Sequence, residues 1–205
     1  MTKGKTILFP KLEKTVEGLE EINKERQDIL QVLIDYIQEK KDNNQEVNLN
    51  FICTHNSRRS QFAQIWAQTA ADYNGVAARC FSGGVEITAF NERAVKSIKR
   101  IGFEASSTGG ENPKYVVKHS EGGDAIMVFS KLYNDEASPK ENFSAIMTCS
   151  HADENCPFIP GTDQRIPVRY DDPKAFDDTE LEAEKYDERS LQIASEMFHV
   201  FSKIK

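Results

Sequence analysis

The chain has 205 residues, of which 26 are Lys or Arg and 33 are Asp or Glu, so its formal net charge is −7. This acidic balance argues against nucleic-acid binding, and no apolar run approaches the length that spans a membrane. Because the first residues lack the apolar stretch of a secretory signal and the four cysteines suit a reducing compartment, we expect a cytoplasmic protein with neither nucleic-acid nor membrane partners.

A charged amphipathic segment runs from about Lys11 to Lys40. Its apolar positions fall near helical spacing: Leu12, Val16, Leu19, Ile29, Leu33 and Ile37. Gly18 weakens the first half, and Asn43-Asn44 marks the end. The sequence therefore predicts an N-terminal helical extension, residues 1–45, before a main domain, residues 46–205. We expect the extension to pack on this domain; a dimerisation helix is the alternative.

A strand, a loop and a helix follow the extension. Apolar and polar residues alternate from Val47 to Phe51, as in a half-buried strand, and helical character runs from Gln61 to about Tyr73. The backbone N–H groups between them can converge on one tetrahedral oxyanion, to which the helix adds the positive end of its dipole. The loop therefore predicts an anion site built from Thr54, His55, Asn56, Ser57, Arg58, Arg59 and Ser60.

Two side chains give this loop its chemistry. Cys53 ends the strand, and Arg59 follows it by six positions. Arg59 can hold an oxyanion by two hydrogen bonds, and the same positive surroundings favour the thiolate form of Cys53, which makes this sulfur a nucleophile at neutral pH. The alternative is a buried cysteine at a strand end and a surface arginine on the next helix.

The elements that follow alternate between strands and helices. We predict a strand over Val76–Phe81 in which Cys80 packs in the core, a turn at Ser82-Gly83-Gly84, a helix over Asn91–Ile101 closed by Gly102, strands over Ala125–Phe129 and Ser144–Thr148, and a helix within Thr179–Lys203. This alternation predicts an α/β fold with a parallel sheet and helices on both faces. In such folds ligands bind at the carboxyl edge of the strands.

Two more cysteines, Cys149 and Cys156, lie in one short segment. They are seven positions apart, which is wider than the usual spacing in zinc knuckles, and no second pair exists, so we predict no metal site. There are two alternatives to a chemical role for this pair. The two cysteines could form half of a metal site with His151, or they could be buried cysteines that happen to fall close together.

Three segments carry a family resemblance. The segment Cys53-Thr54-His55-Asn56-Ser57-Arg58-Arg59-Ser60 resembles the phosphate-binding loop of the low-molecular-weight protein tyrosine phosphatase superfamily, which includes the thioredoxin-coupled arsenate reductases. The segment Ile146–Pro157 closely resembles the redox segment of those reductases, and Tyr170-Asp171-Asp172-Pro173 resembles the superfamily's Asp-Pro loop. The resemblance implies that residues 46–205 form a catalytic domain with a four-stranded sheet of the low-molecular-weight phosphatase type.

The resemblance also implies a mechanism. Cys53 attacks arsenate, Cys149 attacks Cys53 and releases arsenite, and Cys156 attacks Cys149 to leave a disulfide for thioredoxin, the expected electron donor. The segment between Cys149 and Cys156 must unwind for this, because seven helical positions span about 10 Å whereas a disulfide needs Cα atoms within about 7 Å. No tightly bound cofactor is expected, and whether a potassium or other ion orders the loop stays open.

Asp172 is the implied general acid, because it directly precedes Pro173 as the acid does in the Asp-Pro loop. Asp171 is the second candidate, and an ordinary acidic turn is the alternative. Two loop positions depart from the family pattern: His55 stands where glycine is common, and Arg58 where cysteine is common. His55 can narrow the pocket or add a titrating charge, and Arg58 can attract oxyanions or point to solvent.

Other loop positions match the reductase pattern. Asn56 would order the loop through hydrogen bonds, and Ser60 would bond to the Cys53 thiolate. The sequence thus predicts an arsenate reductase. The second candidate is a low-molecular-weight phosphatase that hydrolyses phosphate monoesters through a cysteinyl-phosphate at Cys53, with Cys149 and Cys156 protecting that thiol. A non-catalytic redox sensor or oxyanion-binding module is the third.

Overall fold

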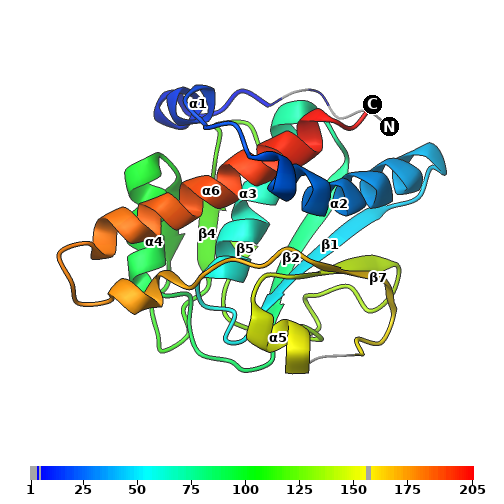
Figure 1. The fold of residues 1–205 in the computed structure, drawn as a ribbon. Helices are drawn as coiled ribbons and strands as arrows, with labels where there is room; N and C mark the ends of the chain where they lie inside the picture. The colour runs from blue at the N-terminus through cyan, green and yellow to red at the C-terminus, as the bar shows by residue number, and fades with distance from the viewer. Residues whose placement is uncertain (1–3, 5, 156–157) are drawn as a thin grey trace.

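The computed structural model describes residues 4, 6–155 and 158–205, which form an α/β fold (Figure 1). The helices are α1 (Pro10–Glu17), α2 (Lys24–Asp42), α3 (Arg59–Asn74), α4 (Glu92–Ile101), α5 (Ser150–Asn155), the 3-10 helix η1 (Pro173–Phe176) and α6 (Glu182–Ser202). The strands are β1 (Val47–Cys53), β2 (Ala78–Gly84), β3 (Glu104–Ser107), β4 (Tyr115–Lys118), β5 (Ile126–Val128), β6 (Phe143–Met147) and β7 (Thr162–Pro167). Within the described ranges, no helix is long and apolar enough to cross a membrane.

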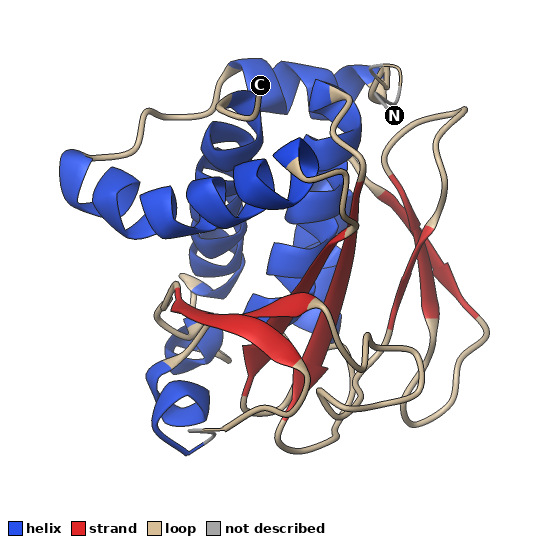
Figure 2. Ribbon diagram, turned by 90° about the vertical axis from the view of Figure 1, so that its right-hand side faces the viewer, coloured by secondary structure: helices blue, strands red, loops and turns tan. Residues whose placement is uncertain are grey.

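Four parallel strands form the main sheet, in the order β2-β1-β6-β7. Helices flank this sheet (Figure 2), so the predicted α/β class and the four-stranded parallel sheet are confirmed. β1 and β6 are neighbours, with Ile52 opposite Met147. Because both strands run the same way, Cys53 at the end of β1 and Cys149 shortly after β6 lie at the same edge of the sheet.

The prediction was wrong about one strand of the main sheet. The apolar run Ala125–Phe129 contributes β5 to a separate antiparallel sheet, in the order β3-β4-β5, and Met127 in its centre is 48% exposed. The fourth parallel strand is β7, whose residues Thr162-Asp163-Gln164-Arg165 are polar. An edge strand needs few apolar residues, so a search for continuous apolar runs missed β7.

The strand β1 is buried along its whole length, not half-buried as the alternation predicted. The loop between β5 and β6 covers the polar face: Asn48 Nδ2 donates to the carbonyl of Asn142 at 3.3 Å, and Asn50 Nδ2 to that of Tyr133 at 3.0 Å. Long-range hydrogen bonds thus engage the side-chain nitrogens of both asparagines, whereas Asn50 Oδ1 is buried with no hydrogen-bond partner among the described residues.

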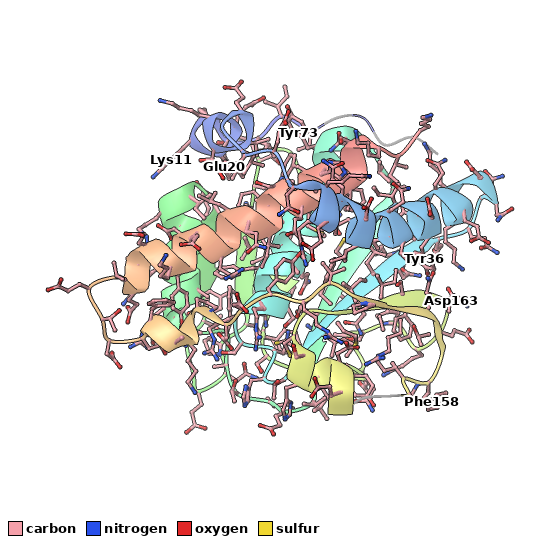
Figure 3. The ribbon with its side chains drawn as sticks, viewed as in Figure 1. Lys11, Glu20, Tyr36, Tyr73, Phe158 and Asp163 are labelled. Carbon is pink, nitrogen blue, oxygen red and sulfur yellow. The ribbon has the colours of Figure 1, made fainter. Side chains whose placement is uncertain are left out.

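The predicted N-terminal segment forms two helices, α1 and α2, with a break over residues 18–23. Side chains of both helices belong to the same hydrophobic core as the residues of the main sheet: Leu12, Leu30, Leu33 and Ile37. Polar contacts join α2 to β7 as well, where the Tyr36 hydroxyl donates to Asp163 Oδ2 at 3.0 Å (Figure 3). Each buried leucine stabilises this packing by about 1.5 to 3 kcal/mol.

Candidate active site

The loop after β1 presents its N–H groups to its own interior. Its carbonyl groups accept hydrogen bonds from surrounding elements: Thr54 O from Val85 N (2.8 Å) and Glu86 N (2.9 Å), His55 O from Ser130 Oγ (2.8 Å), Asn56 O from Gln61 Nε2 (2.9 Å), and Ser57 O from Asn91 N (3.0 Å). Among described residues, no hydrogen-bond acceptor is assigned to the N–H groups of residues 54–58. Carbonyls held outward and free N–H groups ahead of α3 form a cradle for a tetrahedral oxyanion.

Asn56 holds the loop in this shape. Its φ is 46°, a left-handed conformation that asparagine tolerates better than most residues. Its side chain accepts from the backbone N–H of Lys131 at 3.0 Å and donates to Ser60 Oγ at 2.8 Å. Ser60 Oγ in turn lies 3.0 Å from Cys53 Sγ, the contact that the resemblance implied. The Ser60 hydroxyl can therefore hydrogen-bond the sulfur of Cys53.

Gly84 allows the loop to pack against β2. A Cβ atom at this position would lie 2.8 Å from the backbone nitrogen of Asn56 and 2.8 Å from the carbonyl oxygen of Thr54. The predicted turn over residues 82–84 is wrong, because these residues end β2. Their glycines serve close approach of neighbouring backbone rather than a chain reversal.

Asp172 faces the loop, and two arginines bind it. Arg58 Nε lies 2.8 Å from Asp172 Oδ1, and Arg59 Nη2 lies 2.8 Å from Asp172 Oδ2. Burial alone would raise the pKa of Asp172, but Arg59 and then Arg58 outweigh burial and hold this pKa below its ordinary value. Of the two aspartates considered, only Asp172 contacts the loop; the Asp171 side chain is 97% exposed.

Arg59 has further capacity to bind an anion. Its Nη1 donates to the carbonyl of Tyr170 at 3.1 Å, and its buried Nε has no hydrogen-bond partner among described residues. An unused donor on a guanidinium beside free amides suits an oxyanion ligand. Arg58, whose orientation the sequence left open, is buried and turned to Asp172 rather than to solvent.

Cys149, which directly precedes α5, and His151 of α5 adjoin the same loop. Thr54 Oγ1 lies 3.5 Å from Cys149 Sγ and 3.2 Å from His151 Nδ1. Cys149 is 1% exposed and shares a small buried cluster with Cys53. Figure 1 shows α5 at the lower edge of the molecule. The structure thus brings Cys53, Thr54 and Cys149 together, whereas Cys156 lies outside the described residues.

The second loop position that departs from the expected pattern is His55, which is partly exposed. His55 Nε2 lies 3.1 Å from Glu86 Oε2, and the His55 side chain is 39% exposed. Cys80 is buried in the core, as predicted, and burial followed by the charge of Asp72 raises the pKa of its thiol. In the described parts of the chain, no three His, Cys, Asp or Glu side chains are grouped as metal ligands.

Several supporting residues were not found from the sequence. Lys131 holds Asn56 through its backbone, and its own side chain is almost fully buried, which lowers its pKa to about 8. Ser130 and Gly84 likewise act on the loop from other strands and loops. Each lies 28 or more positions from its partner in the loop, so no local motif could indicate it.

The fold is that of the low-molecular-weight protein tyrosine phosphatases. One solved structure with this fold is that of a YwlE mutant from Bacillus subtilis, with 14% identity, coverage of 77% of this chain and 97% of that chain, and a TM-score of 0.51. Another is a low-molecular-weight phosphotyrosine phosphatase from Vibrio cholerae O395, with 11% identity, coverage of 76% and 94%, and a TM-score of 0.50.

Sequence similarity identifies the branch. No protein-family model matches the chain. An arsenate reductase from Brevibacillus brevis is 32% identical over 124 residues, which are 60% of this chain and 74% of that protein. An arsenate reductase from Staphylococcus aureus is 30% identical over 125 residues, 60% of this chain and 76% of that protein. The chain belongs to the arsenate reductase family, a family of enzymes.

Proposed function

We propose that this protein reduces arsenate to arsenite through a relay of Cys53, Cys149 and Cys156. One observation carries the proposal: the Thr54 hydroxyl of the amide loop touches the sulfur of Cys149, and Cys149 is buried in one cluster with Cys53. A phosphatase needs a nucleophile in such a loop but no second thiol beside it. Reduction by two electrons through a disulfide needs a second thiol, and Cys149 can supply it within the same chain.

The proposed steps balance in atoms and electrons. The Cys53 thiolate attacks arsenic(V), and one arsenate oxygen leaves as water after protonation. The Cys149 thiolate then attacks the Cys53 sulfur; the electron pair of the sulfur–arsenic bond stays on arsenic, which leaves as arsenite. The two sulfurs are thereby oxidised to a disulfide while arsenic gains two electrons. Cys156 next displaces Cys53 from Cys149, and an external dithiol reduces the resulting disulfide.

The ion pair between Arg59 and Asp172 breaks during this cycle. Before substrate binds, Arg58 and Arg59 keep its carboxylate ionised. An arriving oxyanion competes for Arg59 and places negative charge beside Asp172. Both effects favour the protonated carboxyl, which can then donate to the departing oxygen. The guanidinium of Arg59 passes from the carboxylate to the substrate.

A thioredoxin-like dithiol protein is the proposed reductant, since no tightly bound cofactor is needed for thiol exchange. The cytoplasm is the proposed compartment, because reducing conditions there regenerate the thiols. Whether a monovalent cation assists the loop is a separate question that potassium dependence of the rate would answer.

The test uses the cysteine variants. In an assay coupled to thioredoxin and thioredoxin reductase, Cys149→Ser should abolish arsenate-dependent consumption of NADPH and leave hydrolysis of a phenyl phosphate ester largely intact. Cys80→Ser is the matched control, because Cys80 packs in the core away from the loop. Full arsenate turnover in Cys149→Ser refutes the relay.

Ester hydrolysis through a cysteinyl-phosphate at Cys53 is the second candidate function. It is favoured by the contact of Ser60 with the Cys53 sulfur at the base of the loop and by the ion pair of Arg59 with Asp172, because a nucleophile, an arginine and a general acid suffice for that reaction. Hydrolysis without any arsenate turnover in the wild-type protein would establish it. Full activity of Cys53→Ser in both assays would refute both enzymatic functions and favour a sensor or binding role.

A further inference from the structure

Arg26, in α2 of the N-terminal extension, binds a buried carboxylate of the C-terminal helix α6. Its Nε donates to Glu196 Oε1 at 2.9 Å, and its Nη2 donates to Glu196 Oε2 at 2.6 Å. Glu196 is 1% exposed, and a carboxylate so buried requires a charged partner with good hydrogen-bond geometry. The two-armed contact from Arg26 provides this geometry. The extension therefore neutralises a charge inside the main domain.

Glu196 connects this ion pair to Tyr170, two positions before Asp172. The Tyr170 hydroxyl donates to Glu196 Oε2 at 2.7 Å, and the guanidinium carbon of Arg26 lies 5.2 Å from the centre of the Tyr170 ring. Arg26 Nη1 also donates to the carbonyl of Arg169 at 3.3 Å. Burial, followed by Glu196, raises the pKa of Tyr170 well above its ordinary value, so the phenol keeps the proton that it donates.

The backbone of Tyr170 reaches the candidate active site. Its carbonyl accepts from Arg59 Nη1 at 3.1 Å, and its N–H donates to the carbonyl of Thr148 at 3.1 Å, directly before Cys149. A shift of the Tyr170 ring therefore moves an acceptor that helps to place Arg59. Direct contacts run from Arg26 through Glu196 and Tyr170 to the guanidinium beside the amide loop.

We propose that Arg26 is a positioning residue for the oxyanion chemistry: acting through Glu196 and Tyr170, it holds Arg59 and the Asp172 segment in place at the loop. This inference rests on the proposed function and gives the N-terminal extension a part in it. The extension lies outside the segments that carry the family resemblance. A buried ion pair adds little net stability compared with apolar packing, but it fixes the positions of the groups that it joins.

The experiment compares Arg26→Ala with Arg100→Ala. Arg100 of α4 binds Asp187 of the same helix α6 with a similar fork, at 2.9 and 2.7 Å, and its described contacts lie on α6 alone. In Arg26→Ala we expect kcat/KM for arsenate reduction to fall about ten- to a hundredfold, because a small displacement of Arg59 misplaces the substrate. The dissociation constant of inorganic phosphate, measured by calorimetry, should rise too. Arg100→Ala should keep wild-type values of both.

A double-mutant cycle separates positioning from general destabilisation. Tyr170→Phe removes the hydroxyl through which Arg26 is proposed to act. Adding Arg26→Ala to Tyr170→Phe should therefore reduce kcat/KM by a smaller factor than Arg26→Ala does alone. Independent, multiplicative losses overturn the proposal, and so do wild-type kcat/KM and phosphate affinity in Arg26→Ala.

Arg26→Lys keeps the test decisive if Arg26→Ala does not fold. Lysine leaves a positive charge beside Glu196 but lacks the second arm and the planar group over Tyr170. For Arg26→Lys we expect a thermal midpoint close to wild type with a partial loss of kcat/KM and of phosphate affinity. A folded Arg26→Lys protein with wild-type kcat/KM and wild-type phosphate affinity refutes the positioning role of Arg26. Phosphate binding needs no redox turnover, so it tests positioning even if arsenate reduction itself fails.

Discussion

Arg58 is a loop position at which the sequence departs from the pattern that it resembles, and in the structure it binds Asp172 with two nitrogens. The sequence indicated Cys53 and Arg59 because their chemistry is set by a short strand–loop–helix segment. It left Arg58 open, because the partner of Arg58 lies 114 positions away. Single residues could thus be predicted where the local backbone fixes their direction, and not where a distant loop does.

Replacing Arg58 by glutamine should make the free energy of unfolding depend less on pH in the acid range. The pKa of Asp172 in the folded protein lies below its unfolded value, so its ion pairs stabilise the fold above about pH 4 and are lost as pH falls through the folded pKa. Arg58→Gln should therefore cost about 2 kcal/mol of unfolding free energy at pH 7, with a smaller cost toward pH 3. Urea unfolding at several pH values measures this.

The control for Arg58→Gln is the same change in an Asp172→Asn background. Without the carboxylate there is no ion pair to lose, so the cost of Arg58→Gln should no longer vary with pH between about 3 and 5. An equal pH dependence in both backgrounds would assign the effect to another acid.

Helix α5 is held to the rest of the molecule by its charged side chain Asp153, which is buried and contacts Arg165 of β7 and Arg169 after it. Arg169 Nε donates to Asp153 Oδ2 at 2.8 Å. These contacts keep Cys149 at the loop in the reduced protein. They also oppose the unwinding that a Cys149–Cys156 disulfide requires.

Oxidation should therefore expose the backbone of residues 150–155. On an intact helix, residues seven positions apart would lie about 10 Å apart, more than the roughly 7 Å that a disulfide allows between Cα atoms, so we expect α5 to open. Hydrogen exchange measured on reduced and oxidised protein tests this, and unchanged protection over 150–155 contradicts it. Asp153→Asn, which weakens the anchor, should raise exchange in the reduced protein as well, whereas the exposed neighbour Glu154→Gln should not.

Among the elements, β1, α3, α4 and α6 were predicted close to their observed bounds because each has a clear apolar period or a capping residue such as Gly102. The exchange of β5 for β7 in the main sheet had no local signal. A polar edge strand and a short apolar strand are distinguished by which strand they pair with, and pairing is a property of the whole fold.

At the scale of the whole molecule, the extension and the sheet share one core. Leu33 of α2 and Trp66 of α3 are both fully buried in the same hydrophobic cluster, and the Trp66 ring meets Phe103 and Phe198 edge-on. Separating α2 from the sheet would expose these buried apolar side chains to water, which costs free energy. We therefore expect one cooperative unfolding transition that includes α1 and α2.

Leu33→Ala tests this cooperativity from the extension. Removing a fully buried leucine leaves a cavity and should lower the unfolding free energy by about 2 to 5 kcal/mol. Trp66 is the single tryptophan, so its fluorescence reports on the packing of α3 against Phe103 and α6, while circular dichroism reports on all helices. If the core is shared, both signals should shift by the same amount in Leu33→Ala, whereas the exposed substitution Val32→Ala on the same helix should shift neither by much. A circular-dichroism change at lower denaturant than an unshifted Trp66 transition would instead mean that the extension unfolds alone. The contacts from Arg26 through Glu196 to Tyr170 would then be lost before the rest of the chain unfolds.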